Sequence, residues 1–270
     1  MKELMKTEEK EELVELLRKV IYDLTGNFYP DERMKILEYK FERLLKETGI
    51  TPGGPKDAVS YFLSDAERRK KLINLMTVPE TSFFREKEQL DVLFGSVLRG
   101  NVSLDICSVG CSTGQEPYTL AMMMAKNNLG GTVIGMDINE EALRKAREGT
   151  YRSSELKDIP KDYREFVKVD GEVLRIREDI KGRVRFVYAN LIEEDSFKPF
   201  HGRFSAVLCR NVLIYFDPPS KKTALLNLKN ILRRDGVLVL SSTEILPSEY
   251  RDIFKPFKEG RFFFYRRSEA

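Results

Sequence analysis

The clearest candidate for ligand chemistry is the stretch CSVGCSTGQEPY, in which a short apolar run meets a loop bounded by Gly110 and Gly114. Glycines after a strand let the backbone turn tightly and approach a ligand, and the following helix offers free N–H groups. A dinucleotide loop would carry a further glycine between these two, and a phosphate loop would end in Gly-Lys-Ser or Gly-Lys-Thr. Here Gln115 and Glu116 follow instead. Because a carboxylate repels phosphate, the pattern favours a ligand with positive charge; a plain strand–helix turn is the alternative.

A second acidic residue, Asp137, ends the apolar run VIGMD. An acidic side chain about 20 residues beyond a glycine loop commonly binds the hydroxyl groups of a ribose. The alternative is that Asp137 caps the helix that follows it. The loop and Asp137 together favour a nucleoside without phosphates. S-adenosylmethionine, which carries a ribose, an ammonium and a sulfonium, therefore fits better than a nicotinamide dinucleotide.

The glycine loop and Asp137 can form one site only if the fold brings the ends of their strands together. From residue 86 onward, apolar runs expected to be strands (104–108, 133–137, 184–188, 204–209 and 237–241) alternate with helical patterns (116–127, 139–148 and 220–232). Such alternation predicts a mainly parallel, doubly wound α/β sheet. An Asp170-Gly171 turn between two β-type runs predicts a hairpin inside a small antiparallel insertion at about 152–182.

Residues 1–85 are expected to form a separate all-α N-terminal domain and linker, and residues 86–270 the α/β domain. Apolar residues recur at helical spacing through the first part of the chain, and Gly49 ends one of these helices. Four basic residues lie off the apolar stripe of that helix: Lys35, Lys40, Arg43 and Lys46.

The composition excludes several classes of protein. The net charge of +3 is too small to imply nucleic-acid binding. No apolar run approaches the ~18 residues of a membrane helix, and the acidic first residues do not resemble a signal peptide, so a cytoplasmic location is expected. Three cysteines with one histidine, His201, argue against a zinc site. We expect no metal, no membrane insertion and a monomer.

The chain resembles the chemotaxis receptor methyltransferases, the CheR family, over nearly its full length. Five ordered motifs carry this resemblance: TVPETSFFRE, CSVGCSTGQEPYTLAM, GMDINEEALRKAREGTY, RFVYANLIEED and CRNVLIYFD. It implies a Rossmann-like class I S-adenosylmethionine-dependent methyltransferase domain. It also implies methylation of glutamate side chains on chemoreceptors, giving methyl esters and S-adenosylhomocysteine.

The resemblance also implies roles for particular residues. It places Thr81 and Arg85 over the cofactor, with Arg85 orienting the substrate carboxylate and Tyr215 shaping its approach. At Pro79 relatives carry an asparagine, so one side-chain contact to the cofactor is in doubt. The other cofactor-binding residues that it implies, beside Gly110, Gly114, Glu116 and Asp137, are Asn190, Leu191, Asn211 and Val212.

The implied partners are the cytoplasmic helices of methyl-accepting receptors, docked through the basic N-terminal helices. Some relatives also bind a pentapeptide at the receptor C-terminus through their β-insertion, but the short VDGEV hairpin argues against such a tether here. Two alternatives stay open. One is a methyltransferase of the same fold that acts on another protein or a small molecule. The other is a non-catalytic module that keeps the cofactor as a signalling ligand.

Overall fold

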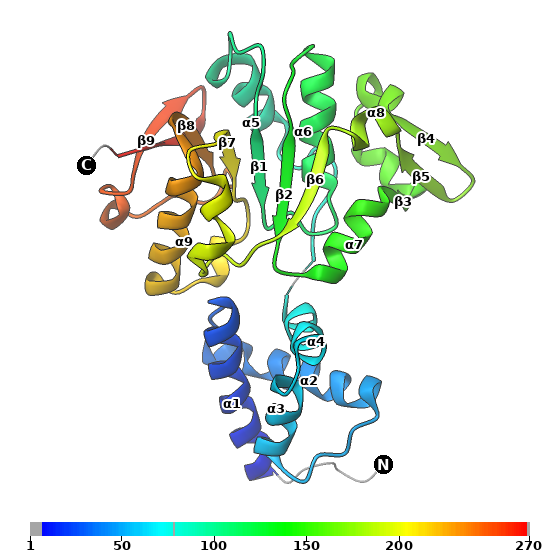
Figure 1. Cartoon of the computed structure of the whole chain (residues 1–270), viewed down its shortest axis with the longest axis vertical. Helices are drawn as coiled ribbons and strands as arrows, with labels where there is room; N and C mark the ends of the chain where they lie inside the picture. Colours follow the sequence, from blue (N-terminus) through cyan, green and yellow to red (C-terminus); the bar gives the residue numbers. More distant parts are fainter. Residues whose placement is uncertain (1–6, 78, 269–270) are drawn as a thin grey trace.

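The computed structural model describes residues 7–77 and 79–268, so the outermost parts of the two predicted domain ranges lie outside it. Four helices form the N-terminal part, which lies below the sheet in Figure 1. They are α1 (Thr7–Thr25), α2 (Met34–Thr48), α3 (Pro55–Leu63) and α4 (Ala66–Met76).

The helices form where the sequence signals predict them. Leu17, Leu37 and Phe41 are fully buried in the core of the bundle, as an apolar stripe at helical spacing requires. Gly49 ends α2 in the left-handed conformation at φ 68°, which costs glycine little. Asp65 caps α4, because its carboxylate accepts a hydrogen bond from the next turn of backbone.

A seven-stranded sheet forms the second part, in the order β6-β2-β1-β7-β8-β10-β9. The parallel strands are β1 (Ile106–Val109), β2 (Val133–Asp137), β6 (Val184–Tyr188), β7 (Phe204–Leu208) and β8 (Leu232–Val239). Antiparallel β10 (Phe262–Arg267) and β9 (Phe254–Glu259) extend one edge. The predicted Rossmann-like α/β architecture is confirmed.

Helices cover both faces of this sheet. They are α5 (Lys87–Val92), which continues as the π-helix Leu93–Val97, α6 (Gln115–Lys126), α7 (Glu140–Glu148) and α9 (Pro218–Ile231). Ile106 and Val133 belong to the core on the α6 face, whereas their neighbours Cys107 and Ile134 belong to the core on the α9 face. Successive side chains of a strand point to opposite faces, so apolar runs without polar alternation are what a sheet buried on both sides needs.

A small three-stranded sheet projects from one edge of the domain (Figure 1). It contains β3 (Thr150–Arg152), β4 (Val167–Asp170) and β5 (Val173–Ile176), in the order β3-β5-β4. The short helix α8 (Glu178–Lys181) leads back to the main sheet. The predicted hairpin is present, but its turn lies at Gly171 and Glu172, one residue later than predicted, because Asp170 still pairs with Val173 at the end of β4.

The helical part rests on the carboxyl ends of the parallel strands. After α1, Phe28 N donates to Tyr215 O at 2.8 Å, and the Asn190 amide donates to Leu24 O at 2.8 Å. Tyr22 Oη donates to Asp217 Oδ2 at 3.0 Å. The two parts therefore meet where ligands bind in open α/β sheets.

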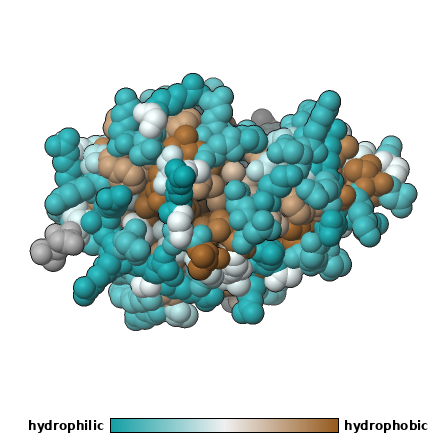
Figure 2. All heavy atoms as spheres, turned by 90° about the horizontal axis from the view of Figure 1, so that it is seen from above, coloured by the Kyte–Doolittle hydropathy of each residue, from teal (hydrophilic) through white to brown (hydrophobic). Residues whose placement is uncertain are grey.

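Figure 2 views the molecule from the end farthest from the helical part. Hydrophilic side chains cover most of that face, and hydrophobic ones gather near its middle. Among the helices described here, none has both the length and the apolar character needed to cross a membrane.

Candidate functional site

A cavity of about 420 Å³ lies between the strand ends and the helical part. Seven of the residues singled out from sequence line it: Gly110, Asp137, Asn190, Leu191, Asn211, Val212 and Tyr215. Four others belong to its surroundings rather than to its wall: Thr81, Arg85, Gly114 and Glu116.

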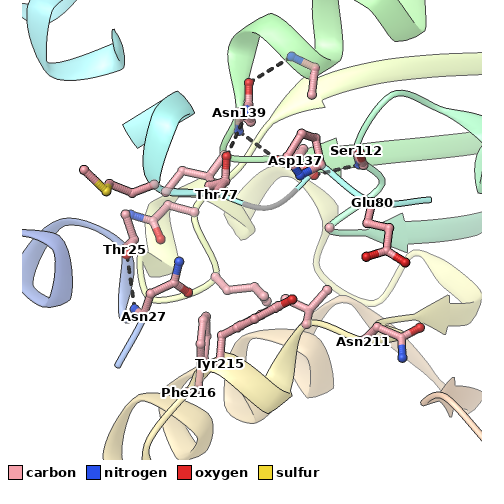
Figure 3. Close-up of a pocket in the computed structure, with 18 of the residues that line it drawn as sticks. Thr25, Asn27, Thr77, Glu80, Ser112, Asp137, Asn139, Asn211, Tyr215 and Phe216 are labelled. Atoms are coloured by element: carbon pink, nitrogen blue, oxygen red, sulfur yellow. Dashed lines mark hydrogen bonds between the residues drawn. The ribbon is translucent and has the colours of Figure 1, made fainter. Parts of the chain in front are cut away.

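The cavity is elongated, with different chemistry at its ends (Figure 3). Thr25 and Asn27, from the loop after α1, lie at one end. Glu80 and Asn211 lie at the other, and Asp137 lies between the ends on one side. Both the helical part and the sheet therefore contribute walls to one site.

The loop after β1 approaches the cavity so closely that only glycine fits at its start. Gly110 has φ 71°, and a Cβ there would lie 2.3 Å from Val212 Cγ2. Ser112 is also left-handed, at φ 51°, and its buried hydroxyl has no hydrogen-bond partner in the described structure. Non-glycine residues held in this conformation cluster at ligand sites. The loop is thus strained beside the cavity, with the Ser112 hydroxyl buried inside the fold.

Asp137 is held by backbone amides rather than by a cation. Its carboxylate accepts from Ser112 N at 2.7 Å and from Asn139 N at 2.8 Å. Burial raises the pKa of Asp137 despite these hydrogen bonds. The cap of α7 is Asn139, whose Oδ1 accepts from Ala142 N at 2.9 Å, so the alternative role of Asp137 as a helix cap is wrong.

Glu116 pairs with Arg210, a buried arginine that lines the cavity. Its Oε2 lies 2.6 Å from both Nε and Nη2 of Arg210, and its Oε1 accepts from Ser108 Oγ at 2.7 Å. Arg210, whose side chain is 3% exposed, also donates to Arg85 O at 2.9 Å and lies 3.8 Å from Glu86. A buried carboxylate needs such a counter-charge. Arg210 carries one positive charge for both Glu116 and Glu86, so the contact with a cationic ligand expected of Glu116 stays a prediction.

Gly114 serves the packing of the sheet domain. It adopts φ 94°, and a Cβ at this position would lie 2.8 Å from Ala146 Cβ and 3.1 Å from both Phe186 and the Tyr151 hydroxyl. Gly114 therefore lets α6 begin against α7, and the direct cofactor contact expected of it stays a prediction. Only Gly110 of the two loop glycines lines the cavity.

Asn190 lines the cavity, but its amide group is already used. Its Nδ2 donates to Leu24 O and to Glu193 Oε1, at 2.8 and 2.9 Å, and its Oδ1 accepts from Ile192 N at 3.3 Å. The side chain therefore ties the helical part to the sheet and has no N–H left to donate, although its Oδ1 can accept a second hydrogen bond. The adenine contact expected of Asn190 stays a prediction. Leu191 remains in place to pack against a base.

Asn211 and Tyr215 follow β7, on the side of the cavity opposite Asp137 (Figure 3). Asn211 has φ 59°, and its N–H donates to Glu244 Oε2 at 2.7 Å. Glu244 also accepts from Ser241 N, and burial raises the pKa of Glu244. This carboxylate holds the strained backbone at Asn211 and so positions Val212 against the glycine loop.

The segment from Pro79 to Arg85 crosses from the helical part to α5. Pro79 and Glu80 line the cavity. The backbone carbonyl of Arg85 is fixed by Arg210, while its side chain is half-buried. The cofactor contacts expected of Thr81 and Arg85 stay predictions.

The helical wall carries positive charge. Arg33 and Lys40 line the cavity, and Lys40 Nζ contacts the carbonyls of Met76 and Thr77 at 3.3 and 3.4 Å. Burial and the nearby Arg43 lower the pKa of Lys40. Lys40 therefore faces the cavity rather than an outer docking surface, unlike the exposed Lys35 and Lys46.

These groups fit a nucleoside with an amino-acid tail. The volume lies within the range of about 300–1,000 Å³ that is typical of small-molecule sites. Asp137, which lines the cavity, can accept ribose hydroxyls. The glycine loop admits a ligand close to the backbone, with no lysine for phosphate.

The pattern of the CheR methyltransferase SAM-binding domain matches residues 79–263. The chain belongs to the CheR methyltransferase family. Its cofactor is S-adenosylmethionine, and its α/β domain has the class I methyltransferase fold.

Three relatives of this CheR-family chain are chemotaxis protein methyltransferases. That of Salmonella typhimurium is 31% identical and covers 83% of this chain and 81% of its own. That of Borreliella burgdorferi is 29% identical, covering 88% and 89%, and that of Escherichia coli 30% identical, covering 84% and 82%.

Sequence reasoning missed Arg210, Asn139 and Asn27. The signal for Arg210 was a lone charge directly after the buried run that ends at Leu208 and Cys209. The signal for Asn139 was its place two residues after a strand-end aspartate, where a cap is common. Asn27 had no signal, because only the packing of α1 against the sheet brings it to the cavity.

Proposed function

We propose that this protein transfers the methyl group of S-adenosylmethionine to glutamate side-chain carboxylates of chemoreceptors, forming methyl esters. The observation that carries the proposal is the extent of the likeness to chemotaxis protein methyltransferases. The Salmonella relative matches 83% of this chain, which is more than residues 79–270 contain, so the likeness extends into the helical part.

The chemistry of the cavity supports a carboxylate acceptor. Bound S-adenosylmethionine supplies an activated methyl group. A glutamate with a pKa of about 4.3 is already ionised at pH 7, so the site needs no general base. Arg33 and Lys40 give the helical wall a charge that attracts an anionic side chain. In this proposal Tyr215 shapes the approach and Arg85 orients the carboxylate, so catalysis depends on alignment.

The test uses purified protein, methyl-labelled S-adenosylmethionine and chemoreceptor-containing membranes. We expect protein-bound label that mild alkali releases as methanol, because carboxylate methyl esters are base-labile. Alkali-stable label would indicate another kind of acceptor. Binding of the cofactor with no transfer to any membrane preparation would indicate a non-catalytic module. Receptor in which the candidate glutamates are replaced by alanine is the control.

We further propose that the protein works as a cytoplasmic monomer and that its β-insertion binds no receptor tether. The β4–β5 hairpin turns through two residues, and the edge strand β4 is only four residues long. A C-terminal receptor pentapeptide is therefore expected to show no binding by calorimetry up to millimolar concentration. Micromolar affinity would contradict this.

A further inference from the structure

The helical part contributes an unpaired amide to the cavity. Asn27 lies in the loop after α1, where its backbone N–H donates to Thr25 Oγ1 at 3.1 Å. Its side-chain carboxamide has no hydrogen-bond partner among the described residues, and Figure 3 shows it directed into the cavity. A half-buried amide without a partner in a ligand site is a group available to the ligand.

The position of this amide is set by the sheet domain. Asn27 forms an isolated backbone bridge with Phe216, and Phe28 N donates to Tyr215 O at 2.8 Å. Gly26, at φ 73°, packs so closely that a Cβ would lie 2.6 Å from Ile192 Cγ2. The loop is thus anchored on both sides of Asn27. Ordering this side chain on ligand binding therefore costs little conformational entropy.

The neighbouring amide of Asn190 has no N–H left to donate. Asn190 has its Nδ2 on Leu24 O and Glu193 Oε1, and its backbone N–H donates to Ser196 Oγ at 3.2 Å. Asn27 is therefore the asparagine side chain at this end of the cavity whose donors and acceptor are all free.

The end of the cavity that holds Asn27 suits the nucleobase. With the ribose on Asp137, the base and the amino-acid tail extend in opposite directions. Glu80 and Asn211 mark the end toward the β7 loop, whereas Asn27 marks the opposite end (Figure 3). Leu191 also lines the cavity and can cover a ring face.

We infer that the Asn27 carboxamide binds the adenine of the cofactor, accepting from the 6-amino group and donating to N1. Adenine places a donor and an acceptor side by side, which a carboxamide matches with two hydrogen bonds. The inference rests on the proposal that this cavity holds the cofactor. Residue 27 precedes the family pattern, which begins at residue 79, so that pattern assigns it nothing.

The consequence is that the cofactor bridges the two parts of the molecule. The same ligand contacts Asp137 on the sheet and Asn27 on the helical part, so binding it stabilises their mutual arrangement. The substrate would then meet cations of the helical wall that the cofactor itself has helped to position.

The test combines one protein change with one ligand change. Calorimetry without receptor measures the affinity of S-adenosylhomocysteine and of its analogue lacking the 6-amino group. We expect Asn27→Ala to weaken the affinity for S-adenosylhomocysteine, the natural product of the reaction, about threefold to tenfold. Removing the amino group should weaken binding to the unchanged protein by a similar factor. Asn27→Ala should then show a smaller further loss with the analogue than with the natural product, because the hydrogen bond to the 6-amino group is already absent and only the one to N1 remains to be lost.

Two more variants keep the outcome interpretable. Asn27→Asp retains the acceptor for the 6-amino group, so it should still distinguish the two ligands. Asn230→Ala removes an asparagine side chain outside the cavity wall and should leave both affinities unchanged. Losses that simply add would overturn the inference in favour of a structural role for Asn27, and an unchanged affinity in Asn27→Ala would refute it outright. Receptor methylation is assayed separately, so its failure would not be confused with failure of this contact.

Discussion

Asp137 and Glu116 have similar settings in the sequence. Glu116 follows the glycine loop, Asp137 ends the next strand, and both are predicted to contact the cofactor. In the structure their environments differ. Asp137 lines the cavity and is held only by backbone N–H groups. Glu116 is not among the lining residues, and its carboxylate lies 2.6 Å from the guanidinium of Arg210.

The difference shows how a buried carboxylate becomes either a ligand group or a structural group. Backbone amides hold Asp137 without cancelling its charge, so the charge remains for a ribose. A buried arginine pairs with Glu116 and joins it to the Arg85–Glu86 segment. The kind of partner therefore decides the role, and four experiments can break or sharpen this contrast.

Replacing Arg210 should have the largest effect. Arg210→Met leaves Glu116 buried without its counter-charge, which costs about 3–5 kcal/mol of unfolding free energy. It also frees Arg85 O, so methyl transfer should be lost. The measurements are urea unfolding and the receptor assay.

Arg203→Met is the matched control for Arg210→Met. Arg203 pairs with Asp105 at 3.2 Å, but both side chains are about one-third exposed. We expect Arg203→Met to lower the free energy of unfolding by about 1 kcal/mol or less. Equal losses in the two variants would contradict a special role for the buried cluster.

Arg85→Ala should lower turnover by about 100-fold, because a misplaced substrate carboxylate reacts slowly. The affinity for S-adenosylhomocysteine should change by about threefold or less, the size of a lost weak contact. Steady-state methylation kinetics and calorimetry separate the two effects. Unchanged turnover would refute the orienting role, and a large loss of affinity would make Arg85 a cofactor residue instead.

Asp137→Asn should weaken the binding of S-adenosylhomocysteine by about ten- to thirtyfold. This factor corresponds to the about 1.5–2 kcal/mol that a hydrogen bond to a charged group contributes. Glu116→Gln should show the reverse pattern, with a larger loss of stability than of affinity. Calorimetry and thermal unfolding of both variants test the contrast. If Glu116→Gln weakens binding more than Asp137→Asn does, the assignment of the two carboxylates is wrong.

The smallest effect should be the pH dependence. Burial raises the pKa of Asp137, so affinity for S-adenosylhomocysteine should fall as the pH drops through that raised value, and Asp137→Asn should remove this dependence. The stability of the ligand-free protein should depend on pH in the opposite direction. The contribution of Asp137 to the free energy of unfolding is fully present below its unfolded pKa of about 3.9. It is lost as the pH rises through the folded pKa.

Glu86 offers the contrasting titration. Burial opposes its ionisation, but hydrogen bonds from Ser242 and Ser241 and the charge of Arg210 together lower its pKa. Its contribution to stability is therefore present above the unfolded pKa and is lost as the pH falls through the folded value. Chemical denaturation between pH 4 and 7.5, with Glu86→Gln for comparison, distinguishes the two groups. Matching slopes for both groups would contradict the contrast.

Local pattern was enough for most of the fold. Apolar runs without polar alternation predicted the central strands, and β2 and β6 have the predicted bounds. β9 was not predicted, because FKPFKE carries a proline and three charges. It is nevertheless an edge strand, which tolerates both.

The sequence by itself determined the elements, the glycine at 110 and the acidic residue at the end of β2, because backbone geometry and side-chain period act over a few residues. The tertiary structure decided which polar groups are free. Arg210 pairs with Glu116 from 94 positions away, and Leu24 takes one N–H of the Asn190 amide from 166 positions away. An N–H group that is already donated is unavailable to a ligand, and only the folded chain shows which partner uses it.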